Sequence, residues 1–322
     1  MAVLNVAYCT NENYSKLMTI SIVSLLDNNR NLNELNIYCL ETDLRDETKK
    51  NIRDIVKEFH REIVFINIIQ CCEENRFWND KRDTMFARIL IPILVNQGKV
   101  LYLDCDTLVL GSLDSLAQEE FDEAVCLVVQ DTTRPDGRIE SGLAENDRYF
   151  NSGVLYIDCN RWNSDKIFFK LKNYEELFSE EGHFPDQRPL NAVLSSKSKF
   201  IPVKYNVTSD YYTIKYVHLK KYVQTSKFYS KDEVMSAINN PFIVHFSGDE
   251  INRPWYRKSI HKEKDKFLYY MGLNKFTKFN AYEISGKTYI KQWLKLKCPI
   301  IVRYLINKIK QRKMNIDREK NI

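Results

Sequence analysis

Short apolar runs alternate with stretches of helical periodicity along most of the chain. Residues 3–9 form an apolar run that ends in the polar turn 10–13, and residues 17–26 then place apolar side chains on most faces of a helix. Strand, polar turn and buried helix in this order open a βαβ unit. The alternation recurs and predicts an α/β fold with a mostly parallel sheet and helices on both faces. We expect further strands at 35–40, 63–69, 99–109, 124–129, 154–157, 200–203 and 242–246, and helices around 52–59, 86–93 and 165–178.

Local signals refine this pattern at three places. Pro92 should kink the helix around 86–93, because proline lacks the N–H that continues a helix. The polar segment 132–148 contains one proline and two glycines and is expected to be a loop. Residues 151–153 are expected to precede the strand that begins at Val154.

Two carboxylates one residue apart end the apolar run at 99–103. In an extended strand, Asp104 and Asp106 project to one face while Cys105 projects to the other. Two carboxylates on one face repel each other, and a divalent cation would relieve that repulsion. A solvated strand end with two acids is the alternative interpretation of this pair.

Other polar residues occupy comparable positions. The turn 10–13, the Asp104–Asp106 pair, Asp131 and His245 all lie where predicted strands end. Ligands of open α/β sheets gather beyond the carboxyl ends of the strands. Neither a G-x-G-x-x-G nor a G-x-x-x-x-G-K-[ST] motif is found in the sequence, so a bound diphosphate would require a metal and cationic side chains.

Charge divides the chain into an acidic body and a basic end. Residues 274–322 hold thirteen Lys and Arg against three acidic residues, so they carry +10 while residues 1–273 carry −5. We therefore predict a catalytic domain over 1–273 and a basic amphipathic helical segment over 274–322. Apolar residues interleave with the charges over 289–313, which favours contact with an anionic membrane rather than nucleic acid. A terminal helix packed on the domain is the alternative.

Cysteine usage and targeting signals bear on the compartment. The eight cysteines include no C-x-x-C pair, which is typical of a reducing environment. No secretory signal and no apolar run long enough to span a bilayer is found. We expect a cytoplasmic protein with peripheral contact at the inner face of the plasma membrane; the sequence does not indicate an oligomeric state.

Five short motifs in a fixed order resemble glycosyltransferase family 8, the retaining GT-A enzymes that include bacterial lipooligosaccharide galactosyltransferases and glycogenin. The resemblance covers roughly residues 3–257. The residues that carry it are Phe86-Ala87-Arg88-Ile89, Val100-Leu101-Tyr102-Leu103-Asp104-Cys105-Asp106, Phe150-Asn151-Ser152-Gly153-Val154-Leu155, Pro185-Asp186-Gln187 with Leu190-Asn191, and His245-Phe246-Ser247-Gly248 with Arg253-Pro254-Trp255.

The resemblance implies that Asp104, Asp106 and His245 bind Mn²⁺ together with the diphosphate of a UDP-sugar donor. Two carboxylates alone would suit Mg²⁺, which stays an alternative, but an imidazole ligand shifts the preference toward Mn²⁺. A buried core histidine is the alternative for His245. The resemblance further implies a donor site made of Asn11, Asn13, Arg88, Asp104, Cys105, Asp106, Asn151, Ser152, Gly248 and Arg253, and catalytic roles for Asp186 and Gln187.

Several of these assignments have structural alternatives or depart from the family pattern. Asn11 and Asn13 would contact uridine, although Asn is also common in turns. Asp186 could instead cap the helix that follows it. The Gly248–Arg253 segment is two residues longer than the family's diphosphate clamp and has Arg in place of Lys. Arg188 stands where relatives usually carry an acid and could alter sugar or acceptor preference.

The function expected from this resemblance is retaining transfer of galactose or glucose from a UDP-sugar to a lipid-linked or protein-linked glycan. Gln187 would support an oxocarbenium-like state in a front-face route, because a glutamine is a poor nucleophile for double displacement. Asp131 is a weaker candidate on the acceptor side, and residues 71–83 are expected to line the acceptor site. A non-catalytic GT-A partner of another transferase is the alternative. A nucleotidyltransferase would need a glycine-rich basic loop, which residues 10–14 do not offer.

Overall fold

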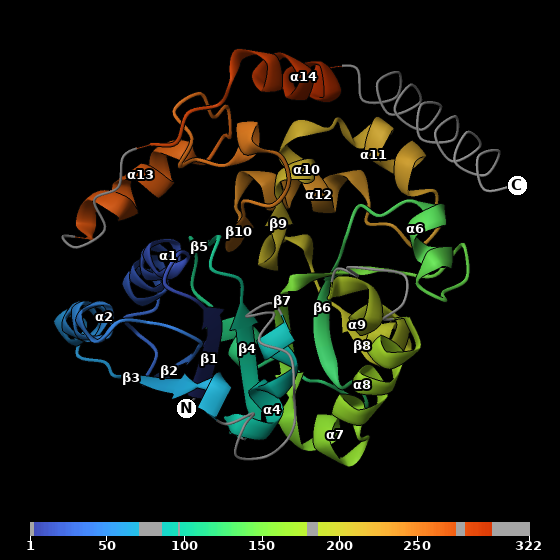
Figure 1. The fold of residues 1–322 in the computed structure, drawn as a ribbon. Helices are drawn as coiled ribbons and strands as arrows, with labels where there is room; N and C mark the ends of the chain where they lie inside the picture. Colours follow the sequence, from blue (N-terminus) through green and yellow to red (C-terminus); the bar gives the residue numbers. More distant parts are fainter. Residues whose placement is uncertain (1–2, 71–85, 96, 179–185, 275–280, 298–322) are drawn as a thin grey trace, which may run out of the picture.

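A computed structural model describes residues 3–70, 86–95, 97–178, 186–274 and 281–297. Its centre is a seven-stranded sheet in the order β3-β2-β1-β4-β7-β6-β8 (Figure 1). All strand pairs of this sheet are parallel except those that β7 makes with β4 and β6. The mostly parallel sheet expected from the sequence is thereby confirmed. The strands are β1 (Val3–Thr10), β2 (Glu34–Glu41), β3 (Ile63–Asn67), β4 (Lys99–Leu103), β6 (Cys126–Gln130), β7 (Phe150–Asp158) and β8 (Ser198–Phe200).

Helices cover both faces of the sheet (Figure 1). Alternate residues of each central strand enter different cores: Leu101 and Leu103 pack with α1 and α2, whereas Val100 and Tyr102 pack with the helices opposite. This two-sided burial explains why the strands are apolar throughout. The helices are α1 (Ser15–Asn28), α2 (Asp46–Glu58), α4 (Ile91–Leu94), α5 (Asp114–Ala117), α6 (Pro135–Glu140), α7 (Cys159–Ser164), α8 (Ile167–Phe178), α9 (Gln187–Leu194), α10 (Ser209–Thr213), α11 (Tyr216–Val223), α12 (Lys231–Asn239), α13 (Lys264–Leu273) and α14 (Gly286–Lys297).

A second, three-stranded sheet in the order β5-β10-β9 lies beyond the ends of β1 and β4 (Figure 1). Its strands are β5 (Thr107–Val109), β9 (Val207–Thr208) and β10 (Ile243–His245). Because β5 follows β4 after only three residues, this small sheet brings distant parts of the chain to the edge of the large one.

Several local expectations were wrong. The segment around Pro92 is a 3₁₀ helix (Phe86–Leu90) followed by α4, because a proline fits best in the first turn of a new helix. The stretch 132–148 contains the short helix α6. Residues 151–153 do not precede the strand but are part of β7, which begins at Phe150. The strand expected over 99–109 is broken by a turn at Asp104–Asp106, where the N–H of Thr107 donates to the carbonyl of Asp104.

The described part of the C-terminal segment packs on the body. The backbone N–H of Ile251 donates to the side chain of Gln292 in α14 at 3.0 Å. The rest of the amphipathic stretch, from 298 onward, and the expected acceptor loop 71–83 lie outside the described residues. Among the described helices, none is long and apolar enough to cross a membrane.

Candidate functional site

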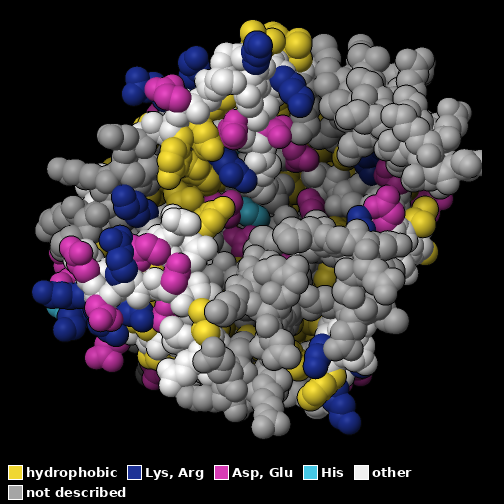
Figure 2. All heavy atoms as spheres, viewed as in Figure 1, with side chains coloured by type: hydrophobic (Ala, Val, Ile, Leu, Met, Phe, Trp, Pro, Cys, Tyr) yellow, Lys and Arg dark blue, Asp and Glu magenta, His cyan; other side chains and the backbone are white. Residues whose placement is uncertain are grey.

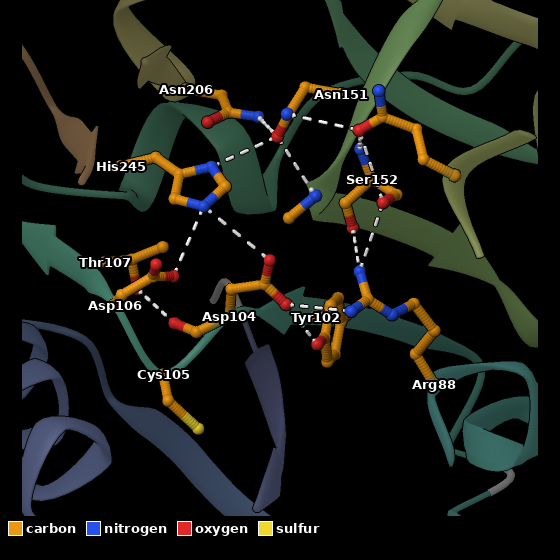
Figure 3. A network of polar contacts seen from close by, with 12 residues as sticks. Arg88, Tyr102, Asp104, Cys105, Asp106, Thr107, Asn151, Ser152, Asn206 and His245 are labelled. Atoms are coloured by element: carbon orange, nitrogen blue, oxygen red, sulfur yellow. Dashed lines mark hydrogen bonds and ion pairs between the residues drawn. The ribbon is translucent and has the colours of Figure 1, made fainter. Parts of the chain in front are cut away.

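Three strand ends meet at one edge of the large sheet. The backbone N–H of Asp104, just after β4, donates to the carbonyl of Gly153 near the start of β7 at 2.8 Å, and the N–H of Phe246, just after β10, donates to the carbonyl of Asp106 at 3.0 Å. Because β7 runs antiparallel to β4, its first residues lie beside the last residues of β4. Residues more than ninety positions apart are thus brought together (Figure 3).

Asp104, Asp106 and His245 form a compact cluster at this edge (Figure 3). The Nε2 atom of His245 is 3.2 Å from Oδ1 of Asp106 and 3.6 Å from Oδ2 of Asp104. One ligand atom from each residue lies within 4.8 Å of the other two, which is close enough for one divalent ion to bind all three.

The two oxygens of Asp104 have different surroundings. Its Oδ1 accepts a hydrogen bond from the hydroxyl of Tyr102 and forms an ion pair with the guanidinium of Arg88 at 3.1 Å. Its Oδ2 instead faces His245. The carboxylate is therefore held from one side and presents its second oxygen to the cluster, as a metal ligand fixed by outer hydrogen bonds does.

The close approach of His245 to Asp104 depends on Gly153. A Cβ atom at this position would lie 2.6 Å from Oδ2 of Asp104 and 2.8 Å from Nδ1 of His245, and closer still to the Cε1 atom of the imidazole. Real Cβ atoms do not approach other atoms this closely. A glycine is needed at position 153 because the side chains of His245 and Asp104 leave no room for a Cβ atom, and not because of its backbone conformation.

The other nitrogen of His245 is held by a pair of asparagines. Its Nδ1 lies 3.1 Å from Oδ1 of Asn151, and that oxygen also accepts hydrogen bonds from the Nδ2 of Asn206 and the backbone N–H of Gly153, both at 3.0 Å. Because an amide oxygen can only accept, the hydrogen bond to Asn151 requires a proton on Nδ1 of His245, and Nε2 faces the aspartates.

The charges at the cluster favour a cation. Burial by itself lowers the pKa of His245, but the carboxylates of Asp106 and Asp104 outweigh it and raise that pKa. Burial by itself raises the pKa of Asp106, but His245 and Arg253 outweigh it and lower that pKa. The cluster thus stabilises positive charge in its midst. Two carboxylates and an imidazole are a ligand set that fits a divalent cation in both charge and chemistry.

Arg88 connects the edge of the large sheet to the start of α9 through ion pairs and a hydrogen bond. Its guanidinium donates to the carbonyl of Ser152 at 2.7 Å and pairs with Asp104 at 3.1 Å and with Asp186 at 3.0 Å. Burial lowers its pKa, but the two carboxylates outweigh burial and raise it, so Arg88 is permanently charged. Asp186 lies at the N-cap position of α9, yet its carboxylate points toward Arg88 rather than capping the helix.

Gln187, the first residue of α9, is held at both ends of its amide. Its Oε1 accepts from the backbone N–H of Ser152 at 3.0 Å and from Nδ2 of Asn151 at 3.2 Å. Its Nε2 donates to Asp131, at the end of β6, at 2.7 Å. Burial raises the pKa of Asp131, and the neighbouring Asp210 adds to the effect. Gln187 thus links Asn151 and Ser152, beside the Asp104–Asp106–His245 cluster, to the carboxylate of Asp131.

The remaining sequence candidates lie around this centre. The side chain of Cys105 points away from the aspartates and donates to the carbonyl of Cys9, so it offers no ligand to the cluster (Figure 3). Asn11 accepts from the N–H of Tyr14, which is turn chemistry. Asn13 and Arg253 line one cavity of about 330 Å³. Gly248 adopts a φ of +90°, which favours glycine, and Arg188 pairs with Glu140 of α6 at 2.7 Å.

Some contributors were missed from the sequence. The sequence motif contained Gly153 but gave no role to its missing Cβ. Asn206 comes from a segment with no motif of its own, so only the fold could place it on Asn151. The bond between Asp131 and Gln187 joins residues 56 positions apart, and no spacing rule predicts it.

Comparison with known proteins identifies the family. The profile of glycosyl transferase family 8 matches residues 5–259. General stress protein A of Bacillus subtilis is 25% identical over 87% of this chain and 96% of its own length. A lipopolysaccharide 1,2-glucosyltransferase of Escherichia coli K12 is 29% identical over 80% of this chain and 74% of its own length.

Solved structures agree on the fold. The galactosyltransferase LgtC, solved with donor and acceptor sugar analogues, aligns with a TM-score of 0.67 at 18% identity, covering 84% of this chain and 96% of LgtC. The glycosyltransferase GlyE of Streptococcus pneumoniae aligns with a TM-score of 0.63 at 22% identity, over 84% of this chain and 60% of GlyE. The fold is therefore of the GT-A type. Because the family profile spans most of the chain, this protein belongs to glycosyltransferase family 8 and is a glycosyltransferase.

Proposed function

We propose that the protein transfers galactose or glucose from a UDP-sugar to a glycan acceptor, with retention of anomeric configuration and dependence on Mn²⁺. The observation that carries the proposal is the cluster of Asp104, Asp106 and His245, which stabilises positive charge beside the held amide of Gln187. A metal bound there would neutralise charge on the departing UDP. The imidazole favours Mn²⁺ over Mg²⁺.

Arg88 and Arg253 have different roles in this proposal. Arg88 holds Asp104 and Asp186 in place, and its guanidinium contributes positive potential to the donor site. Arg253 is the better candidate for direct contact with the diphosphate, because its Nε is buried and lacks a hydrogen-bond partner among the described residues. Such preorganised cations stabilise a leaving group without reorganising during the reaction.

Gln187 supports the developing oxocarbenium-like sugar in a front-face route. Its amide oxygen is fixed by Asn151 and Ser152, and its amide nitrogen by Asp131, so it does not move freely to attack as a nucleophile. In this route an oxygen of the leaving phosphate takes the proton of the acceptor hydroxyl. Asp131, at the far side of Gln187, then lies toward the acceptor.

Donor hydrolysis tests the proposed function. We expect the purified protein to release UDP slowly from UDP-galactose or UDP-glucose when Mn²⁺ is present and to release none when the metal is chelated. A panel of UDP-sugars, followed by chromatography of free UDP, identifies the sugar. One Escherichia coli relative is a lipopolysaccharide 1,2-glucosyltransferase and LgtC is a galactosyltransferase, which supports this choice of donors and a cell-surface glycan as acceptor. Absence of release with every donor, in folded protein, would contradict the proposal.

We further propose that α14 contacts an anionic membrane near a lipid-linked acceptor. Ile290, Trp293 and Leu294 are spaced along one face of this helix and are exposed by 60%, 40% and 43%. Lys287 and Lys291 are exposed on the same helix. Exposed apolar side chains beside lysines suit the interface of an anionic leaflet.

Vesicle flotation tests this contact. A smaller fraction of the double variant Ile290→Glu/Trp293→Glu should be recovered with vesicles that contain anionic lipid. Two carboxylates there replace the apolar side chains that would enter the membrane interface. Phe169→Glu, at a 58% exposed position on α8, is the matched control and should float like the wild type. Equal recovery of all three proteins would rule out docking through α14.

A further inference from the structure

A cavity lined by aromatic residues lies between the β1–α1 turn and the C-terminal segment. Its volume is about 330 Å³. One wall comes from the turn and start of α1 and the other from the chain after the 3₁₀ helix Glu250–Asn252. On the space-filling surface, hydrophobic side chains gather beside the hollow in which a His side chain is visible (Figure 2). The lining residues are Asn13, Tyr14, Lys16, Leu17, Arg253, Trp255, Tyr256 and Tyr282.

Tyr282 belongs to a segment beyond the family-matched residues 5–259. Its backbone is fixed by two hydrogen bonds: its N–H donates to the carbonyl of Trp255, and its carbonyl accepts from the N–H of Arg257, both at 2.9 Å. Ile284, two residues later, is buried. The exposed ring of Tyr282 is thus held on a rigid backbone.

Two of the aromatic rings that line this cavity are largely exposed to solvent. Tyr282 is 55% and Tyr14 is 50% exposed, and the ring of Tyr282 lies 5.5 Å from that of Tyr256, measured between centroids. Large apolar rings that remain open to water around a cavity indicate a binding surface for a flat ligand.

Arg253 links the cavity electrostatically to the cluster of Asp104, Asp106 and His245. Arg253 lines the cavity, and its buried Nε lacks a hydrogen-bond partner among the described residues. The charge of Arg253 also reaches Asp106. A ligand in this cavity would therefore place an anionic group toward Arg253 and the aspartates, and a flat apolar group toward the tyrosines. A nucleoside diphosphate has this distribution.

We infer that Tyr282, supplied by the C-terminal segment, forms with Tyr256 an outer wall of the donor cavity on which the nucleobase of the UDP-sugar stacks. The inference rests on the proposed function, because it takes UDP as the donor nucleotide. It gives the segment after the family-matched region a part in donor binding, in addition to any contact with a membrane.

Calorimetric titration of UDP in the presence of Mn²⁺ tests this wall. Tyr282→Ala should weaken UDP binding about tenfold, within the range that loss of one base–aromatic stack produces. Tyr282→Phe keeps the ring and should bind like the wild type. Tyr269→Ala removes a tyrosine that is 58% exposed on α13, outside the cavity lining, and should also leave UDP binding unchanged.

Inorganic pyrophosphate, titrated under the same conditions, separates stacking from a general disturbance of the site. Its affinity should be the same in Tyr282→Ala and the wild type, because it has no base. Equal losses for pyrophosphate and UDP, or UDP affinity within twofold of the wild type, would overturn the inference while leaving the proposed function in place. Failure of the folded wild type to bind UDP at all would refute the proposed function and the inference with it.

Discussion

Asp106→Asn is expected to lower sugar transfer by about 10³-fold or more, because the site loses one of the two carboxylates proposed to hold the cation that stabilises the leaving UDP. The change is nearly isosteric, so packing around the turn should survive. The backbone carbonyl of residue 106 still accepts from the N–H of Phe246. Initial rates of UDP release from the preferred donor, at saturating Mn²⁺, provide the measurement.

A matched control separates this effect from a general loss of charge. Asp122 is 70% exposed and pairs with Lys199 on the surface, and it lies outside the cluster. Asp122→Asn should keep the wild-type rate. A rate for Asp106→Asn within tenfold of the wild type would show that this carboxylate has no direct part in the reaction.

Gly153→Ala is expected to weaken divalent metal binding about 10- to 100-fold and to reduce transfer with it, as disturbance of the groups around a metal site commonly does. The new methyl group would enter the space that His245 and Asp104 now share. One of the two must move, and the distance between their ligand atoms must increase. The φ of Gly153 lies outside the left-handed region, so alanine introduces no backbone strain.

Gly272→Ala is the matched control for this substitution. Gly272 lies in α13, also outside the left-handed region, and a Cβ there would meet no atom within 4 Å. Alanine in a helix should stabilise the fold by about 0.5–1 kcal/mol and leave metal affinity unchanged. A cooperative thermal unfolding transition will establish whether each variant is folded, and titration with Mn²⁺ will compare their metal affinities. Wild-type metal affinity in folded Gly153→Ala would contradict the geometry of the cluster.

The sheet could be predicted from the sequence because it depends on local signals, whereas the resemblance to family 8 was needed to group Asp104, Asp106 and His245 as candidate metal ligands. Apolar runs such as 99–103 can be recognised without a structure, and the Asp104–Asp106 pair follows one of them directly. Asp104 and Asp106 do not continue an extended strand, as the side-chain alternation predicted, but lie in the turn after β4. The prediction of a shared site still agrees with the structure, because the end of a strand fixes where the turn begins.

Other features depend on contacts that no local pattern encodes. The antiparallel direction of β7 decides that Asn151 and Gly153 lie at the site, and a strand does not reveal its direction from its own residues. The family resemblance places Asn151 in the donor site but does not indicate that its side-chain oxygen contacts His245, as it does in the structure. The same oxygen of Asn151 accepts a hydrogen bond from Asn206, which follows the 3₁₀ helix Val203–Tyr205. No sequence motif marks this segment.

Two buried histidines illustrate why environment must be known. His245 and His261 are both 4% exposed, and each is adjacent to aromatic residues in the sequence or the fold. Burial lowers the pKa of His261 to about 3, whereas the aspartates raise the pKa of His245. Only the placement of carboxylates distinguishes the core histidine from the candidate ligand.

Titration of Mn²⁺ into the protein, followed by the electron paramagnetic resonance signal of free Mn²⁺, tests the central claim most directly. The account predicts one bound ion per wild-type chain, with binding strengthened by UDP, and affinities at least about tenfold weaker for Asp106→Asn and His245→Ala. Equal stoichiometry and affinity in the wild type and both variants would contradict the claim that Asp104, Asp106 and His245 hold the metal.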